Sequence, residues 1–171
     1  SLLGLEEPQP RIDDGTFAAN YTNEGGYGGT IRFLKNIIGL WLMQESRRQW
    51  IRESGPLSFR EIDGWTAAAA PLKRFIDPDD PSFVRPGNMP QKIADFIAAT
   101  GQSAPESRGD VSRCITESLA LAYRRGIETL ERLTGEKIDV LHIIGGGVQD
   151  KMLCECTANA TGKPVVAGPV E

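Results

Sequence analysis

Three consecutive glycines, Gly145–Gly147, come directly after an apolar run at residues 138–144. Glycine costs about 1 kcal/mol relative to alanine inside a helix and loses more backbone entropy than any other residue, so something must need bare backbone here. The apolar run is typical of a strand covered on both faces. Residues 148–161 predict a helix that Gly162 ends. The sequence therefore predicts a strand, a glycine turn and a helix in succession.

Many α/β proteins bind ligands at the turn between such a strand and helix. The turn lies at the carboxyl end of a strand, glycines let a ligand touch the main chain, and free N–H groups at a helix start favour anions. A nucleotide is the natural candidate. The spacing fits neither the dinucleotide fingerprint nor a phosphate loop, because the third glycine follows the second at once and no Gly-Lys-Ser/Thr comes after it. A tight turn with close packing remains the alternative.

The rest of the chain predicts the α/β class with helices in the majority. Strands are expected at both ends and just before the glycine-rich loop at residues 23–30, and a long helix at residues 110–134 is ended by Gly135. Ser58 and Glu61 have the spacing of a capping box at the start of another helix. Because one end begins in a strand and the other stops just past one, we expect a fragment of a longer protein. A complete small domain is the alternative.

Apolar residues recur at three- and four-residue spacing from Ile31 onwards, which predicts one helix over residues 31–53, capped by Thr30. Asn36 and Gln44 would then lie near one face of this helix, roughly 12 Å apart along its axis. That span could touch both ends of a two-substrate cleft. From the residues alone, two solvated polar side chains are the simpler explanation.

Composition limits the function. The chain has 171 residues, 40% hydrophobic and 25% charged, with a net charge of −4, which is typical of a globular protein and argues against a nucleic-acid-binding face. No apolar stretch approaches about 18 residues, so no membrane span is expected. Cys154 and Cys156 would point different ways on a helix, so reduced thiols and a cytoplasmic location are expected. The single histidine, His142, cannot support a multi-histidine metal site and is expected to be structural.

Two segments carry a family resemblance. Residues 20–50, NYTNEGGYGGTIRFLKNIIGLWLMQESRRQW, resemble the corresponding segment of bacterial rhamnulokinases. Residues 139–171, DVLHIIGGGVQDKMLCECTANATGKPVVAGPVE, resemble the adenosine-binding motif of FGGY-type carbohydrate kinases. The resemblance implies an actin-like ATPase fold made of ribonuclease-H-like domains, with a mixed sheet and flanking helices. Residues 1–171 would be most of the C-terminal, nucleotide-holding domain, and the N-terminal sugar-binding domain of the same chain would be its native partner.

The resemblance also implies the reaction, ATP-dependent phosphorylation of L-rhamnulose at its 1-hydroxyl with ATP and Mg²⁺. The middle glycine, Gly146, would contact ATP, with Gly145 and Gly147 shaping the turn. Gln44 would contact the nucleotide and Asn36 the sugar. No catalytic or metal-binding residue is expected in this chain, because the family's base is an aspartate before a Ser-Gly-Thr-Trp-Ser loop, which would lie upstream of residue 1. The fragment alone is therefore expected to be inactive.

Some positions depart from the family pattern. Asp150 stands where asparagine is common, Glu155 where glutamine is frequent and Asn159 where aspartate is frequent. Asp150 suits the dipole at a helix start, but a carboxylate cannot donate a hydrogen bond, so its expected contact with the nucleotide is in doubt. Thr157 and Thr161 occupy positions where some rhamnulokinases have cysteines, so no disulfide is expected there. A kinase for L-fuculose or D-xylulose, or a non-catalytic nucleotide or sugar sensor, remains the alternative.

Overall fold

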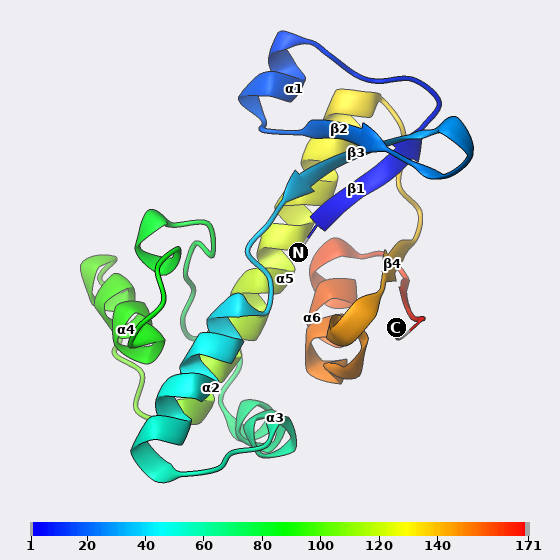
Figure 1. Cartoon of the computed structure of the whole chain (residues 1–171). Coiled ribbons are helices and arrows are strands. Elements are labelled where there is room, and N and C mark those ends of the chain that lie inside the picture. Colours follow the sequence, from blue (N-terminus) through cyan, green and yellow to red (C-terminus); the bar gives the residue numbers. More distant parts are fainter. Residues whose placement is uncertain (1, 170–171) are drawn as a thin grey trace.

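The helix α5 (Arg108–Thr134) is the axis around which the other elements pack. In this computed structural model, which describes residues 2–169, α5 runs the length of the molecule, with a β-sheet at its C-terminal end, three helices around its N-terminal half and α6 beside its middle (Figure 1). The Ser107 side chain accepts a hydrogen bond from the N–H of Asp110, and Gly135 takes a left-handed conformation at the other end. The helix thus ends where Gly135 predicts, but it begins at Arg108, two residues before the predicted residue 110, because Ser107 caps it.

Within residues 2–169, five strands form two separate sheets. An antiparallel sheet has the order β1-β3-β2, with β1 (Leu2–Glu7), β2 (Thr22–Gly25) and β3 (Ile31–Asn36). A parallel pair consists of β4 (Leu141–Ile143) and β5 (Val165–Ala167). The expected mixture of parallel and antiparallel strands is therefore present, but among residues 2–169 no ladder joins the two sheets.

The predicted helix over residues 31–53 is wrong in its first third. Residues Ile31–Asn36 form β3, the central strand of the antiparallel sheet, and the helix α2 begins only at Trp41 and ends at Ser54. The three- and four-residue spacing was misleading because a central strand buries adjacent residues, here Phe33 and Leu34. Pairing with two neighbouring strands decides the conformation, and Gly39 separates strand from helix.

The remaining helices are short, and their boundaries follow local signals. Ser58 and Glu61 form the predicted capping box. Thr30 does not cap a helix; its hydroxyl donates to the carbonyl of Tyr27 at 2.7 Å and closes a turn. Gly101 has a φ of +71° just beyond the end of α4. The elements are α1 (Asp14–Ala18), η1 (Tyr27–Gly29), α3 (Phe59–Ala68), η2 (Pro81–Phe83), α4 (Met89–Ala99), η3 (Gly145–Gln149) and α6 (Lys151–Thr161).

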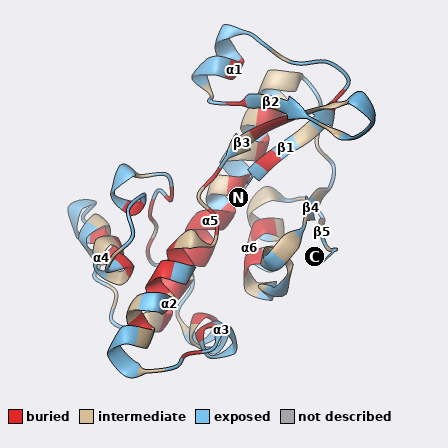
Figure 2. Cartoon of the chain, viewed as in Figure 1, coloured by how far each residue is buried: buried red, intermediate tan, exposed pale blue. Residues whose placement is uncertain are grey.

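The core follows the inner face of α5, where buried residues recur along the helix (Figure 2). Its apolar stripe contains Ile115, Leu119, Tyr123 and Ile127. Close packing of helices depends on Gly109, because a Cβ there would lie 2.7 Å from the carbonyl oxygen of Trp65 on α3. In the described part of the chain, no helix is long and apolar enough to cross a membrane.

Candidate functional site

The glycine turn joins β4 to α6 through η3. Gly145 has a φ of +78°, a left-handed conformation that favours glycine. Its N–H donates to the carbonyl of Pro169 at 3.3 Å, and the N–H of Gly168 donates to the carbonyl of Ile143 at 2.9 Å. These bonds hold the turn against the segment that follows β5. The backbone conformation therefore explains the first of the three glycines.

The other two glycines need a different explanation. Neither Gly146 nor Gly147 has a φ in the left-handed region. A Cβ on Gly146 would meet no described atom within 4 Å, and one on Gly147 would make an ordinary contact of 3.6 Å with the Ile143 side chain. Within residues 2–169, neither conformation nor crowding requires glycine at these positions. The described residues thus give no reason of packing or conformation for glycine at these two positions.

Asp150 caps the helix that follows the turn. Its Oδ1 accepts a hydrogen bond from the N–H of Leu153 at 2.9 Å, and its own N–H donates to the carbonyl of Gly147 at 3.2 Å. Burial raises the pKa of Asp150 above its ordinary value; the N–H of Leu153 opposes this shift, and the nearby charge of Asp63 on α3 adds to it. The predicted position at the helix start is confirmed. This carboxylate connects the end of the glycine turn to the first turn of α6.

Asn36 and Gln44 do not share a helix. Asn36 is the last residue of β3, and Gln44 lies in the first turn of α2, where its N–H donates to the carbonyl of Leu40 at 2.9 Å. The predicted separation along one helix axis is therefore wrong, because the chain changes from strand to helix between them. Both side chains are exposed. The four-residue connection between β3 and α2 nevertheless keeps them on one stretch of surface.

A cavity of about 390 Å³ connects this stretch to the glycine turn. Ile37 and Leu40, which lie between Asn36 and Gln44 in sequence, line it, and so do Gly146 and Gly147. The structure thus brings the two predicted motifs to one cavity, although they are about 100 residues apart in sequence. The rest of the lining is mainly apolar: Leu2, Leu3, Tyr123, Leu141, His142, Ile143, Ile144 and Leu153.

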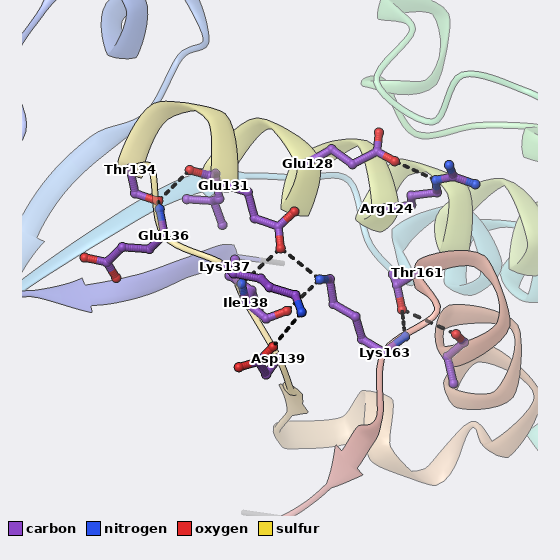
Figure 3. A network of polar contacts seen from close by, with 12 residues as sticks. Arg124, Glu128, Glu131, Thr134, Glu136, Lys137, Ile138, Asp139, Thr161 and Lys163 are labelled. Carbon is purple, nitrogen blue, oxygen red and sulfur yellow. Dashed lines mark hydrogen bonds and ion pairs between the residues drawn. The ribbon is translucent and has the colours of Figure 1, made fainter.

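A polar network fixes the strand that leads into the turn (Figure 3). Glu131 on α5 accepts hydrogen bonds from the Lys163 ammonium at 2.8 Å and from the N–H of Ile138 at 3.0 Å. Lys163 also donates to the carbonyl of Ile138 at 2.6 Å. The hydrogen bond from Lys163 lowers the pKa of Glu131, so the carboxylate is the stable form at neutral pH. Because Ile138 precedes β4 and Lys163 precedes β5, both strands are tied to the end of α5.

Two residues near the turn, Tyr123 and Asp63, were not predicted from the sequence. Tyr123 lines the cavity from α5, and burial raises its pKa to about 12, with a further contribution from Asp150. Asp63 on α3 is near enough for its charge to act on Asp150. Tyr123 could have been found, because it lies four residues from both Leu119 and Ile127 in the buried stripe. Asp63 had no such signal, since only tertiary packing brings α3 beside the start of α6.

The environments of His142 and of the three cysteines are visible in the structure. His142 lies on β4 but is exposed, so the strand is not covered on both faces in the described residues, contrary to the sequence-based expectation. Cys114, Cys154 and Cys156 are free. Residues 2–169 contain no group of three or more His, Cys, Asp or Glu side chains that could hold a metal ion.

Comparison with known proteins places this geometry in a family. Residues 1–171 match the model of the FGGY family of carbohydrate kinases, C-terminal domain. The whole chain is 47% identical to a rhamnulokinase from Bacteroides thetaiotaomicron, over 171 residues that make up 34% of that protein. It is 42% identical to a rhamnulokinase from Enterococcus faecalis and 40% identical to one from Bacillus subtilis, covering 34% and 35% of those proteins.

A solved structure agrees with the fold. The crystal structure of xylulose kinase from Rhodospirillum rubrum matches this chain with a TM-score of 0.67 and 18% sequence identity. The match covers 98% of this chain and 33% of the xylulose kinase chain. The chain thus has the α/β fold expected from the sequence, that of an actin-like ATPase domain, and spans about a third of the length of the curated relatives it matches. It belongs to the FGGY family of carbohydrate kinases, whose C-terminal domain it matches from residue 1 to residue 171.

Proposed function

We propose that the full-length protein phosphorylates L-rhamnulose at its 1-hydroxyl with ATP, and that residues 1–171, as most of its C-terminal domain, hold the nucleotide. The observation that carries this proposal is the pair Gly146 and Gly147, which nothing in the described structure requires to be glycine. A bare main chain at the start of a helix suits a nucleotide phosphate or ribose. The sugar is proposed from the three curated relatives, which are named rhamnulokinases.

In this proposal the glycine turn binds ATP, and the segment between β3 and α2 spans both substrates. Gly146 would contact the nucleotide, Gly145 and Gly147 would shape the turn, and Gln44 would contact ATP. Asn36 would contact the sugar. The positions of these residues support the proposed roles, since Gly146, Gly147 and the segment between Asn36 and Gln44 all line one cavity.

Asp150 has a narrower role in the proposal. One of its carboxylate oxygens already accepts the N–H of Leu153, so this side chain orders the start of α6 and thereby the turn before it. A contact with the nucleotide would use the remaining acceptor capacity and would need a donor on the base or ribose.

The reaction is an in-line phosphoryl transfer. A base takes the proton of the sugar 1-hydroxyl, the oxygen attacks the γ-phosphorus, the bond to the bridging β,γ-oxygen breaks and ADP leaves. We expect the base upstream of residue 1, so this chain would bind and orient ATP without moving the proton. Mg²⁺ would enter with ATP and would neutralise negative charge on its phosphates, and we assign none of the described residues to it. The free thiols support a cytoplasmic location.

A coupled ADP-release assay on the full-length protein tests the proposal, with Mg-ATP and a panel of L-rhamnulose, L-fuculose, D-xylulose and glycerol. Preference for L-rhamnulose would support it, and preference for another ketose would replace the substrate. Binding of ATP without turnover of any sugar would favour a sensor and refute the kinase. In an active enzyme, Gln44→Ala should raise the KM for ATP and Asn36→Ala the KM for sugar; if both changes moved the same constant, these two assignments would be wrong.

A further inference from the structure

A second cavity, of about 330 Å³, lies between α5, the C-terminal half of α6 and residues 71–75, which follow α3. Its lining shares no residue with that of the cavity at the glycine turn. Most of this lining is apolar, with Leu72 and Phe75 from the segment after α3, Leu121 from α5 and Ala160 from α6. Its volume is near the lower end of the range of small-molecule sites.

A buried ion pair lies in the wall of this second cavity. The side chain of Glu117 is 5% exposed and that of Arg113 is 16% exposed. The Nε of Arg113 donates to Oε1 of Glu117 at 2.6 Å, and Oε2 of Glu117 accepts the N–H of Leu72 at 2.8 Å. Both oxygens of Glu117 therefore have a donor, as a carboxylate removed from water requires.

Arg113 has hydrogen-bonding capacity left over. A guanidinium carries five N–H groups, on Nε, Nη1 and Nη2. Besides the bond from Nε, Nη1 donates to the carbonyl of Thr66 at 3.4 Å and to the sulfur of Met152 at 3.6 Å. Nη2 has no partner among the described residues. This end of Arg113 is therefore available to an acceptor that enters the cavity.

The backbone of Leu72 is strained where it lines this cavity. Its φ is +55°, in the left-handed region that a leucine rarely adopts, and the residue is 71% exposed. The hydrogen bond from its N–H to Glu117 holds it in this conformation. Strained backbone of this kind gathers at ligand sites, where the surrounding structure maintains it. Leu72 is thus an observation independent of Arg113 that points to a ligand here.

α6 adds two polar groups to the wall, the amide of Asn159 and the thiol of Cys156. Burial raises the pKa of Cys156 and the nearby charge of Arg113 opposes this shift, so the protonated thiol, a weak donor, is the stable form at neutral pH. Together with Nη2 of Arg113, these groups make the polar part of the wall rich in donors. An apolar cavity with a few converging donors suits an apolar ligand that carries acceptors at one end.

We propose that this second cavity binds a small carboxylic acid with an aromatic or alkyl body. Its carboxylate accepts hydrogen bonds from Nη2 of Arg113 and from the Asn159 amide, and its body packs against Leu72 and Phe75. A carboxylate is favoured over a neutral acceptor, because a hydrogen bond between two charged groups is roughly twice as strong as a neutral one. The inference goes beyond the proposed function and does not depend on it, and its tests use neither ATP nor sugar.

Isothermal titration of the full-length protein with 2-naphthoate is the first test, with 2-naphthol as the probe that lacks the carboxylate. We expect saturable binding at one site, roughly tenfold tighter for 2-naphthoate than for 2-naphthol. Ala160→Phe would fill the cavity and should weaken the binding of 2-naphthoate by roughly tenfold. Ala158→Phe is the matched control, since it adds the same ring to the same helix at a residue outside the lining. No saturable binding of 2-naphthoate, or equal affinity in the two variants, would overturn the proposal.

Cysteine labelling locates the ligand without any substitution. Cys156 lines the cavity, whereas Cys154 lies on the same helix outside the lining, and both are free and partly buried. Saturating 2-naphthoate should slow the modification of Cys156 by a maleimide roughly tenfold and leave that of Cys154 unchanged, as followed by peptide mass spectrometry. An unchanged rate at Cys156, or equal protection of both thiols, would show that the probe binds elsewhere and would refute the site.

Discussion

The substitution Gly146→Val separates the roles of the three glycines. Gly146 has no left-handed φ, and its added side chain would extend into space with no described atom within 4 Å of the Cβ. We expect the free energy of unfolding of the full-length protein to change by no more than about 0.5 kcal/mol, as for substitutions away from packed features. The valine would occupy the space in which the proposed nucleotide approaches the main chain.

The expected loss of nucleotide affinity is much larger. Displacing a bound group by about 1 Å can cost roughly a hundredfold, which corresponds to about 2.8 kcal/mol. Gly145→Ala should behave in the opposite way. Its φ of +78° would place an L-residue in the left-handed region, at about 1–2 kcal/mol, with no side chain added near Gly146. Gly146→Val should therefore weaken ATP binding more than it lowers stability, and Gly145→Ala should lower stability more than it weakens ATP binding.

The assay is titration calorimetry with ATP on the full-length protein, combined with thermal unfolding in the absence of nucleotide. Gly25→Val is the matched control, because Gly25 also has open space around its Cβ and no left-handed φ, but lies on β2. Unchanged ATP affinity for Gly146→Val would remove the glycine turn from the nucleotide site. Equal losses of affinity in Gly146→Val and in the control would show that the effect is not specific to the turn.

Three other predictions follow from packing and charge. Gly109→Ala should destabilise the protein by about 1–3 kcal/mol in chemical denaturation, because its Cβ would lie 2.7 Å from the backbone carbonyl of Trp65; a neutral result would refute the close contact of α3 and α5. Asp150→Asn keeps a cap but removes the charge beside Asp63, so it should raise the Tm at pH 7. The pKa of Asp150 in the folded protein lies above its ordinary 3.8, so the wild type gains stability as the pH falls through that raised pKa. The difference in Tm between the wild type and Asp150→Asn should therefore shrink at low pH. A difference in Tm that does not depend on pH would contradict this reasoning. Burial raises the pKa of Cys114 to about 12, so a thiol reagent at pH 8 should modify Cys154 and Cys156 well before it, and rapid labelling of Cys114 in folded protein would contradict its burial.

Sequence signals were sufficient wherever local chemistry determines structure. The helix signals that were correct are the capping box of Ser58 with Glu61, and Gly135 and Gly162 after α5 and α6. Each of them acts within one turn of a helix. The prediction that strand, glycine turn and helix follow one another is confirmed in the same way. These features need no knowledge of distant residues, because the groups that satisfy them are close in sequence.

The errors arose where distant segments decide the conformation. The spacing of Ile31 and Leu34 fits a helix face, yet pairing of this segment with both β1 and β2 makes it a strand. The interaction of Asp63 with Asp150 and the cavity shared by Ile37 and Gly146 likewise join residues from separate elements. No local pattern records such contacts. The resemblance supplied candidate residues for the site, but their arrangement in space came only from the fold.

The three glycines therefore answer different requirements, although they are adjacent in sequence. Gly145 is needed by the chain itself, since its left-handed backbone lets the strand β4 turn while its N–H stays bonded to Pro169. Gly146 and Gly147 have backbones that other residues could adopt, and a Cβ would meet no described atom within 4 Å at Gly146 and only an ordinary contact at Gly147. The proposed nucleotide would supply a reason for these two glycines. Measuring the ATP affinity of Gly146→Val tests that reason directly, because this variant should lose affinity while it keeps its stability.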